Sequence, residues 1–378
     1  MHMVIWVIGR NYPTSENGMQ GTFELEQAKI LSRKGNDVCY LSCSLHPKKR
    51  IRKRGFQSWT EDGVKVFVLS AFFFPRVYPL YFVKLRNWYW RKLLKKVETE
   101  IGTPDVIHIH YPAMLMIAEA LREYREKGVV IAATEHWSKV QNKELDSIEK
   151  REFIKTSEVV DSVICVGTPL GQAVREITGK QAVLVPNIVS GLFKPASQKH
   201  EGFRFVAVGR LVKLKQFDKM IEAFTECFAG RMDVTLTIIG NGEEKDNLQK
   251  LIKEKSITDQ VKLSGGLTRE KTAEAVSNCD VLLCYSIYET FGVPIIEAWA
   301  CGLTTIVTNT AAVVQDYFDQ GLGIRVSPNN IDELKKAMRE IHSDSGRFDK
   351  KYIAQFAQAN FSENTVFDRL MTIYSDKN

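Results

Sequence analysis

The sequence has little of what marks membrane-spanning, secreted or disulfide-linked proteins. No apolar run approaches the ~20 residues that a membrane-spanning helix needs. The seven cysteines are scattered, and no C-x-x-C pair occurs among them, so reduced thiols in a cytoplasmic protein are expected. The short apolar run at residues 1–8 is followed directly by Gly9 and Arg10. It lacks a cationic start and a small-residue cleavage site, so we expect a buried strand there and no signal peptide.

Several ligand-binding motifs are also missing. No G-x-G-x-x-G follows an apolar run, because Gly240-Asn241-Gly242 lacks the third glycine, and this argues against a dinucleotide-dependent oxidoreductase. No G-x-x-x-x-G-K-[ST] is present, which excludes a P-loop. No Asp-x-Asp pair is available to hold a divalent metal on a diphosphate. We therefore predict neither a metal nor a cofactor, and any bound diphosphate would need basic side chains and backbone N–H groups.

What the sequence does contain is typical of a globular chain long enough for two domains. It has 378 residues, of which 44% are hydrophobic and 26% charged, as in ordinary folded proteins. The net charge of +7 is concentrated at residues 48–96, which hold 14 basic and 2 acidic side chains. Such an excess suggests an anionic partner for the first half, and a merely solvated basic surface is the alternative. Nucleic acid is not expected, because no nucleic-acid-binding motif accompanies the charge.

Short β-rich runs alternate with helical periodicity along the chain, which predicts an α/β fold with parallel sheets. Strands are expected at residues 4–8, 37–42, 64–69, 106–110, 129–134, 162–166 and 182–185, and again at 203–208, 234–239, 261–263, 281–284 and 304–308. Helices expected between them include residues 22–34, 113–127 and 217–228. The last of these places one apolar stripe on a core face, formed by Phe217, Met220, Ile221, Phe224 and Phe228. A segment from Pro186 to about His200 follows neither period and is the expected linker.

The stretch from Glu289 to Glu297 follows a predicted strand and opens a helix. Pro294 suits the first turn of that helix, and Gly292 would let the backbone come close to a ligand. The helix N-terminus favours an anion, and the two carboxylates suit the hydroxyl groups of a sugar or ribose. The alternative for either acid alone is an ordinary loop or dipole-favouring carboxylate. The N–H groups expected to face the anion are those of Phe291, Gly292 and Val293.

A basic pair follows the strand at 203–208. Gly209 and Arg210 end that strand, and Lys215 precedes the next helix. Two cations at the carboxyl edge of a parallel sheet fit a diphosphate, and a solvated pair on a loop is the alternative. In the first half, Gly21 joins a strand to a helix and could approach a ligand's phosphates.

Three histidines also lie near strand ends in the first half. His108 and His110 alternate along one strand, and His136 follows the strand at 129–134. A metal site is not expected because no cysteine or carboxylate cluster accompanies them. We interpret His108 as structural and His136 as functional.

Taken together, these motifs resemble glycosyltransferase family 4, a large group of retaining enzymes with the GT-B fold. The resemblance covers nearly the whole chain. Its most specific part is the E-x7-E motif from Glu289 to Glu297, followed by Ala298-Trp299-Ala300-Cys301-Gly302. Looser matches in the N-terminal half are Tyr12-Pro13 with Gly21 and Gln27-Ala28, and residues 34–38. Further matches are Val185-Pro186-Asn187 with Phe193 and Pro195, Val208-Gly209-Arg210-Leu211 with Lys215, and residues 239–242.

The resemblance implies two Rossmann-like domains that face each other across a cleft. The first, residues 1–187, would bind the acceptor, and the second, residues 188–362, would bind the nucleotide sugar. Residues 363–378 would form a helix that crosses back to the first domain. The implied enzyme is a cytoplasmic, metal-independent glycosyltransferase that moves a sugar from a nucleotide diphosphate donor to a glycan or lipid-linked acceptor in cell-surface polysaccharide synthesis.

The resemblance also assigns roles to residues. Arg210 and Lys215 would hold the donor diphosphate, Glu289 the transferred sugar and Glu297 the ribose. The implied catalytic set is Glu289, His136, Arg210 and Lys215. Further donor contacts would come from Gly21, Gly209, Gly265, Leu267, Phe291, Gly292 and Val293, with residues 265–267 beside the base. The chain departs from the family pattern at Gln216, where a glycine is usual, and at Thr304, where a proline is common.

Other functions fit parts of the same pattern. A nucleotide-sugar epimerase or hydrolase of the same fold would act on the donor without an acceptor, and a phosphorylase would need a pyridoxal-binding lysine that the sequence does not reveal. A noncatalytic two-lobed binding protein would close around a small ligand, but it gives no reason for the paired glutamates and paired cations.

The basic region predicts a further partner, an anionic membrane surface at the inner face of the cell membrane. Six of the seven residues 48–54 are basic, and Phe72-Phe73-Phe74-Pro75 follows. A helix is expected at 80–97, with one basic and aromatic face formed by Lys84, Trp88, Arg91 and Lys95. Its opposite, core-facing stripe would be Leu80, Val83, Trp90, Leu94 and Val97. The alternative is an ordinary core beneath a solvated basic face.

Overall fold

The computed structural model describes residues 2–14, 20–46, 55–72, 79–197 and 200–376. The chain divides into two compact units, and each is described by itself. The first unit comprises Met1–Val185 with Phe367–Asn378, and the second comprises Pro186–Val366. The predicted boundary at 187 and 188 lies two residues from this division.

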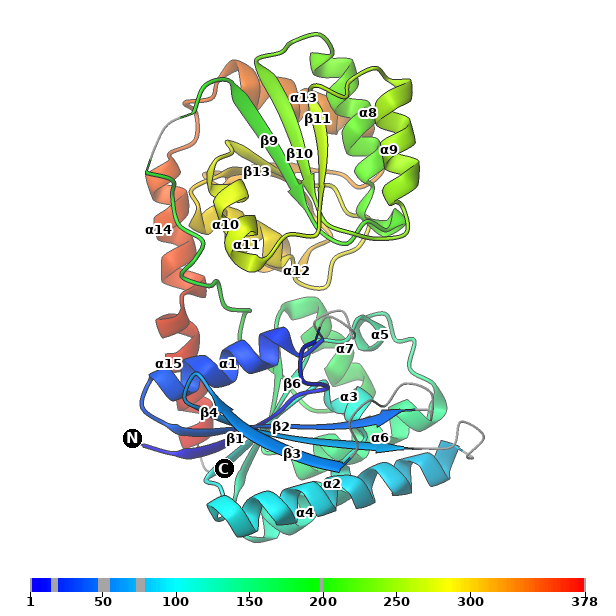
Figure 1. Ribbon diagram of the computed structural model, residues 1–378, viewed down its shortest axis with the longest axis vertical. Helices are drawn as coiled ribbons and strands as arrows, with labels where there is room; N and C mark the ends of the chain where they lie inside the picture. Colours follow the sequence, from blue (N-terminus) through cyan, green and yellow to red (C-terminus); the bar gives the residue numbers. More distant parts are fainter. Residues whose placement is uncertain (1, 15–19, 47–54, 73–78, 198–199, 377–378) are drawn as a thin grey trace. The chain divides into compact units, whose positions relative to one another are not determined.

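The first unit is built on an eight-stranded sheet with the order β3-β4-β2-β1-β5-β6-β7-β8. Every neighbouring pair is parallel except β3 and β4. Helix α1 covers one face, and α2 and α4 cover the other (Figure 1). The strands are β1 Val4–Ile8, β2 Asp37–His46, β3 Gly55–Glu61, β4 Val64–Phe72, β5 Val106–His110, β6 Val130–Glu135, β7 Ser162–Cys165 and β8 Val183–Leu184. The helices are α1 Thr22–Arg33, α2 Pro79–Ile101, α3 Pro112–Leu115, α4 Ala118–Glu126, α5 Ser138–Gln141, α6 Ser147–Val159 and α7 Thr168–Thr178, with α15 Glu363–Ser375 joining from residue 367 on.

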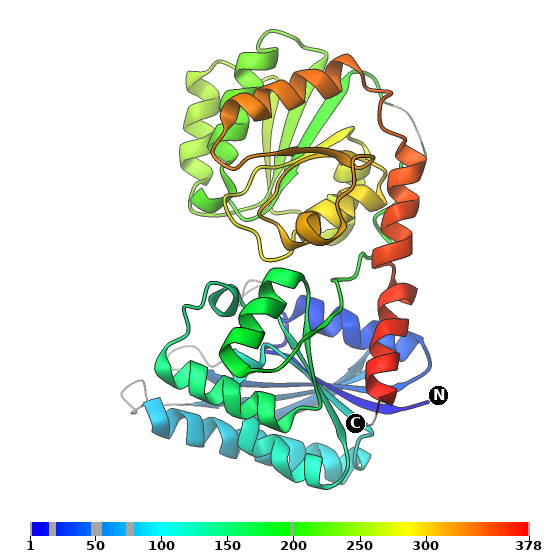
Figure 2. The same ribbon diagram turned by 180° about the vertical axis from the view of Figure 1, so that it is seen from behind.

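The second unit has a six-stranded parallel sheet with the order β11-β10-β9-β12-β13-β14. Helices α8, α9 and α13 pack on one face, and α10, α11 and α14 on the other (Figures 1 and 2). The strands are β9 Phe203–Val208, β10 Val234–Ile239, β11 Val261–Gly265, β12 Val281–Cys284, β13 Thr304–Thr308 and β14 Gly323–Val326. The helices are α8 Phe217–Phe228, α9 Lys245–Glu254, α10 Arg269–Ser277, α11 Val293–Ala300, α12 Ala312–Tyr317, α13 Ile331–Ser343 and α14 Lys350–Phe361, with a short 3-10 turn, η3, at Lys213–Lys215.

In both sheets the chain adds strands first on one side of the first strand and then on its other side. This change of side fixes where ligands can bind. In the first unit the chain moves outward from β1 in one direction through β2, and resumes on the other side of β1 with β5. In the second unit the same change occurs between β9 and β12. Open α/β sheets bind ligands beyond the carboxyl ends of the strands at such switch points.

The apolar stripe predicted for residues 217–228 is confirmed, since all five of its members are buried. The stripe predicted for α2 is confirmed at Val83, Trp90, Leu94 and Val97, while the side chain of Leu80 lies outside the described residues. These stripes anchor the helices that flank each sheet.

The helix predicted at residues 113–127 is wrong as one element. It is divided into α3 and α4 at Met116, which has a left-handed backbone with φ 52°. The reason lies in α2, whose buried Asn87 donates to the Met116 carbonyl oxygen at 2.9 Å and accepts from the Ala120 N–H at 3.0 Å. Arg86 also donates to the Met114 carbonyl oxygen at 2.6 Å. These tertiary contacts override the local helical pattern.

Two strands were not expected from the sequence. Strand β3 pairs antiparallel with β4 at the edge of the first sheet, and β14 forms the edge of the second. The run expected at 182–185 forms only the two-residue strand β8. Strand β3 has no buried residue and β14 is only 4 residues long, so the apolar signal of each strand is small.

Candidate active site

The loops that follow β9 and β12 meet at the switch point of the second unit. The backbone N–H of Ile287 donates to the Leu214 carbonyl oxygen at 2.9 Å, which joins the two loops. The Lys215 ammonium group forms an ion pair with the Glu289 carboxylate. Both side chains keep some exposure, 22% for Lys215 and 17% for Glu289, so a ligand can reach them. Arg210 lies exposed at the end of β9. The sequence-predicted cations and the first glutamate therefore gather at one sheet edge.

Gly292 shapes the start of α11. It is the N-cap residue with φ 103°, and a Cβ there would lie 2.9 Å from Ile295 Cδ1 and 3.0 Å from Val313 Cγ1. Pro294 occupies the first turn, where its missing N–H costs nothing. The first N–H groups of a helix have no intrahelical acceptor and carry a partial positive charge. The turn at Gly292 therefore places the N-terminus of α11, which by its partial charge favours an anion, directly after the segment that carries Glu289.

Glu297 lies one turn into α11 and is buried, with 7% of its surface exposed. Its carboxylate forms an ion pair at 3.3 Å with Arg269, the first residue of α10. Burial raises the pKa of Glu297 to about 7, and the positive charge of Arg269 opposes this shift. Burial therefore disfavours the ionised form of this carboxyl group, and the ion pair with Arg269 favours it.

Close backbone contacts hold the neighbouring loops of β9, β10 and β11 together. The Gly209 N–H donates to the Ile239 carbonyl oxygen, and the Gly240 N–H donates to the Gly265 carbonyl oxygen. A Cβ on Gly240 would lie 1.8 Å from the Gly209 carbonyl oxygen, so only glycine fits. Gly265 ends β11 with φ 70°, and the half-buried Leu267 follows before α10. The predicted base-side residues thus share the sheet edge with Gly209.

Gln216 departs from the family glycine and still adopts the backbone that a glycine favours. It has φ 51° and forms the N-cap of α8. Its side-chain amide donates to Asn329 Oδ1 at 2.6 Å, and Asn329 itself has φ 62°. The hydrogen bond ties the Lys215 turn to the loop after β14. Gln216 therefore keeps the left-handed backbone that a glycine would adopt at this turn, and adds a side-chain hydrogen bond to the loop after β14. Thr304, the other departure, begins β13 and is buried.

The first unit gathers a second polar group of residues at its own switch point. Arg10 follows β1, and its Nε lies 3.4 Å from the buried Glu24 carboxylate in the first turn of α1. The Arg10 guanidinium also lies 4.4 Å from the ring centroid of Tyr111, which follows β5. Gly21 caps α1 with φ 99°, and a Cβ there would lie 1.9 Å from the Asn11 carbonyl oxygen. Gly21 therefore brings α1 against the loop after β1.

His136 lies beside this group, directly after β6. The buried Glu135 carboxylate accepts hydrogen bonds at 2.8 Å from the backbone N–H groups of both His136 and Trp137. Burial raises the pKa of Glu135 to about 7 against these hydrogen bonds. The His136 ring is near-parallel to that of His110 and tilted against that of Tyr111. The loop that carries His136 is therefore fixed by its own strand end.

His108 is structural, as predicted. It is fully buried, and its Nε2 lies 2.6 Å from Thr134 Oγ1. Its Nδ1 lies 2.5 Å from the Tyr374 hydroxyl on α15. The contact joins the C-terminal helix to the sheet of the first unit.

Sequence reasoning gave no role to Arg269, Glu135 or Arg10. Arg269 could have been noticed as the first charge after residues 265–267. Glu135 and Arg10 carry no local signal, since their partners come from other strands. Among the residues that the structure describes, no group of three or more His, Cys, Asp or Glu side chains is placed to hold a metal ion.

Two family profiles match the chain. The family described as Glycosyltransferase Family 4 matches residues 20–190, and that described as Glycosyl transferases group 1 matches residues 192–359. The chain belongs to glycosyltransferase family 4. The predicted family and enzyme class are therefore confirmed: the protein is a glycosyltransferase.

A curated relative of this glycosyltransferase is the phosphatidylinositol N-acetylglucosaminyltransferase GPI3 subunit of Saccharomyces cerevisiae. It is 24% identical over 271 residues, which cover 67% of this chain and 57% of that protein. The chain matches between 57% and 66% of the length of the first such curated relatives.

Solved structures show the same fold. Sucrose-phosphate synthase from Thermosynechococcus elongatus superposes with a TM-score of 0.75 at 19% identity, covering 98% of both chains. The Anabaena protein HepE, solved with UDP and glucose, superposes with a TM-score of 0.73 at 16% identity, covering 99% of this chain and 100% of its own. The glycosyltransferase therefore has the GT-B fold with two Rossmann-like domains, as predicted.

Proposed function

We propose that this glycosyltransferase transfers a sugar, with retention of anomeric configuration, from a nucleoside diphosphate sugar to a glycan or lipid-linked acceptor in cell-surface polysaccharide synthesis. A cytoplasmic location at the inner face of the membrane goes with this role. The solved relative that holds UDP and glucose supports a uridine nucleotide as the first donor to test.

The observation that carries the proposal is the Lys215–Glu289 pair beside the N-terminus of α11. A cation, a carboxylate and a helix N-terminus at one switch point provide for a diphosphate and for sugar hydroxyls together. The diphosphate would replace Glu289 as the partner of Lys215, and Glu289 would then be free to accept from hydroxyls of the transferred sugar. Glu297, held by Arg269, would accept from the ribose hydroxyls.

The same groups support the chemistry of transfer. Cleavage of the bond between the anomeric carbon and the phosphate oxygen leaves negative charge on the diphosphate. Arg210, Lys215 and the α11 N–H groups stabilise that charge as it develops. The acceptor hydroxyl oxygen forms the new bond to the anomeric carbon from the leaving-group face, and its proton passes to a phosphate oxygen of the donor. His136 and Gly21 would contact the sugar and the phosphates from the first unit.

A nucleotide-sugar screen tests this proposal. The protein is heated with UDP, GDP, UDP-glucose, UDP-N-acetylglucosamine and GDP-mannose in turn, and the melting temperature is recorded. Binding at 100-fold above Kd stabilises a protein by about 2.7 kcal/mol, so one nucleotide class should raise the melting temperature by several degrees. The Lys215→Ala variant should lose much of the shift. No shift with any of these compounds at millimolar concentration would contradict the proposed donor site.

A membrane surface remains the proposed site of the acceptor, and α2 is the element that would contact it. Tyr81 and Trp88 are 61% and 47% exposed on this helix, and Lys92 Nζ lies 3.9 Å from the Trp88 ring centroid. Lys84 is exposed on the same helix. Exposed rings beside cations suit an anionic headgroup region. Residues 48–54 and 73–75 of the predicted patch lie outside the described residues.

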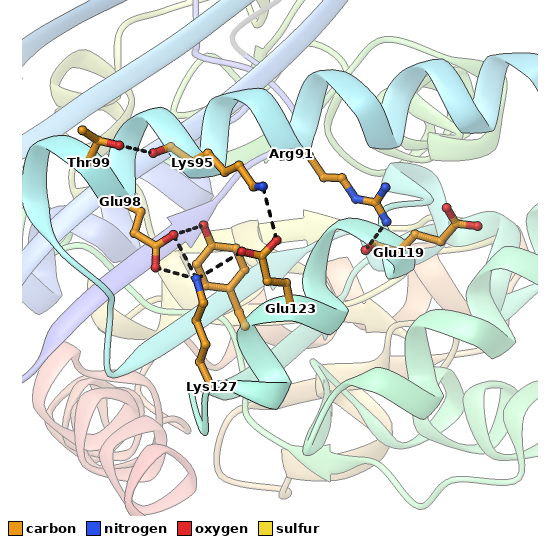
Figure 3. A network of polar contacts seen from close by, with 8 residues as sticks. Arg91, Lys95, Glu98, Thr99, Glu119, Glu123 and Lys127 are labelled. Carbon is orange, nitrogen blue, oxygen red and sulfur yellow. Dashed lines mark hydrogen bonds and ion pairs between the residues drawn. The ribbon is translucent and has the colours of Figure 1, made fainter.

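Fewer of the four residues predicted for the basic face of α2 are free to contact a membrane than the sequence indicated. All four of its members are exposed, but Arg91 and Lys95 contact α4 (Figure 3). Arg91 donates to the Glu119 carbonyl oxygen at 3.1 Å, and Lys95 Nζ lies 3.8 Å from the Glu123 carboxylate. The docking surface is therefore centred on the first half of α2. None of the described helices is both long enough and apolar enough to span a bilayer.

Vesicle co-sedimentation tests the docking surface. Each basic side chain near an anionic bilayer contributes roughly 1 kcal/mol, so Lys84→Glu with Lys92→Glu should reduce binding to phosphatidylglycerol-containing vesicles by more than tenfold. The matched control is Lys250→Glu with Lys253→Glu, which makes the same charge change on the exposed face of α9. Equal loss in both variants, or equal binding to neutral and anionic vesicles at low salt, would contradict docking through α2.

A further inference from the structure

The rings of three histidines, His108, His110 and His136, form a row at the switch point of the first unit. The rings of His108 and His110 are 4.5 Å apart, and those of His110 and His136 are 5.4 Å apart with planes only 11° from parallel. Nδ1 of His110 lies 3.1 Å from Nε2 of His136. This is a hydrogen-bond distance between two ring nitrogens, so one of them must carry the proton.

The rings of His110 and His136 are neutral at ordinary pH, because burial lowers the pKa of each. Burial lowers the pKa of His136 to about 3, with the Arg10 charge adding to the effect. Burial also lowers the pKa of His110 well below its usual range. A neutral imidazole has one N–H donor and one acceptor nitrogen. Two arrangements are therefore possible: His110 donates from Nδ1, or His136 donates from Nε2.

The other nitrogen of His110 decides between them. Its Nε2 is buried and has no hydrogen-bond partner within the described part of the chain. If His136 donated, the His110 proton would have to sit on that Nε2, as a buried N–H without an acceptor. Orphaned buried N–H donors are rarer than under-satisfied acceptors, and leaving one unmade carries the full desolvation cost. The arrangement with His110 as donor avoids it.

We infer that His110 donates from Nδ1 to Nε2 of His136 and so holds His136 as the Nδ1–H tautomer. His136 then presents an N–H donor away from His110. Resting on the proposed function, that N–H binds an oxygen of the transferred sugar. His110 contacts no substrate and is a positioning residue. Glu135 fixes the backbone of His136, and His110 fixes which of its ring nitrogens donates.

The tautomer can be read directly in the free protein. Protein labelled with nitrogen-15 in its histidine rings is studied by long-range proton–nitrogen correlation, with the His136→Asn variant used to assign the signal. We expect His136 to show a protonated Nδ1 and an unprotonated Nε2 near pH 7. A protonated Nε2, or an equal mixture of the two forms, would overturn the inference. This measurement needs no donor and stands apart from the proposed function.

A matched pair of variants tests the role of His110. The amide nitrogen of asparagine can take the place of Nδ1 of histidine, and that of glutamine the place of Nε2. His110→Asn should therefore keep the His136 tautomer and the activity, while His110→Gln should lose the tautomer. With the nucleotide sugar found by the screen, kcat/KM should fall about tenfold in His110→Gln, the scale of a single neutral hydrogen bond.

The two failures are distinguishable. If the tautomer is as inferred but kcat/KM is the same in both variants, His136 does not donate to the sugar, and the sugar contact in the proposed function is wrong. If His110→Asn loses the tautomer as fully as His110→Gln, the donor from position 110 is not what holds His136. Equal melting temperatures of the two variants would show that neither result reflects unfolding.

Discussion

The left-handed Gln216 offers a test of how this chain tolerates the loss of the family glycine. A non-glycine residue in this backbone region costs roughly 1–2 kcal/mol, and the bond from Gln216 to Asn329 returns about 0.5–1.5 kcal/mol. Gln216→Ala removes the bond and keeps the strain, so it should destabilise the protein by about 1 kcal/mol. Gln216→Gly removes both but adds about 0.4–1 kcal/mol of unfolded-chain entropy. It should therefore lie within about 1 kcal/mol of the wild type and above the alanine variant.

Thermal unfolding measures this ordering. A change of 1 kcal/mol shifts the melting temperature by about 2–4 °C in a unit of this size. Asn329→Ala removes the same hydrogen bond from the other side, so it should lower the stability as much as Gln216→Ala does. The double variant should be no less stable than either single variant, within about 0.5 kcal/mol. If the melting temperature of Gln216→Gly is no higher than that of Gln216→Ala, the left-handed backbone at this position carries no strain, which would contradict the prediction.

Four further outcomes follow from the site in the second unit. Arg210→Ala and Lys215→Ala should each weaken nucleoside diphosphate binding by about 1–3 kcal/mol, and unchanged affinity by calorimetry would remove them from the diphosphate site. Glu289→Ala should lower the transfer rate more than diphosphate affinity, whereas Glu297→Ala should act mainly on affinity; wild-type turnover in both would contradict the assigned roles. Transfer should persist in excess EDTA, because basic groups meet the diphosphate charge, and loss restored by Mg²⁺ would oppose this. Burial raises the pKa of Glu297 to about 7, so its contribution to folding stability is lost as pH rises through that value. The ionised form is the better acceptor for hydroxyl groups. Nucleotide affinity should therefore rise from about pH 6 to 8 in the wild type and stay flat in Glu297→Gln.

The sequence predicted the apolar core stripes of α2 and α8. It also pointed to candidate site residues in both units, as a continuous motif in the second unit and as the separate residues Gly21 and His136 in the first. The stretch from Glu289 to Glu297 was interpretable because the glycine, the proline and both carboxylates lie in one short segment that runs from the loop into the start of α11. The Lys215 position followed from the rule that parallel strands share their carboxyl edge. Strand β9 and helix α8 were found with their observed bounds, since their apolar periods are strong and bounded by turn residues.

Other features depended on contacts that no local pattern contains. The division between α3 and α4 is imposed by Asn87, 29 residues before Met116. The pairing of Glu297 with Arg269 joins α11 to α10, two helices that β12 separates in the chain. The smaller free basic face of α2 results from contacts with α4, where Arg91 donates to the Glu119 carbonyl oxygen and Lys95 pairs with the Glu123 carboxylate. In each case a side chain from a distant element changes what the local sequence would do by itself.

The contrast between the two polar sites explains which of them the sequence could reveal. In the second unit the turn proposed to bind the diphosphate is one continuous segment, so its spacing is visible in the sequence. In the first unit Arg10, Glu24, Tyr111 and His136 come from the ends of β1, β5 and β6 and the start of α1. Their chemistry exists only once the strand order places β5 beside β1. A residue such as His110 therefore reads as one apolar-strand histidine in the sequence, and its influence on His136 follows from the sheet that brings β5 and β6 into register.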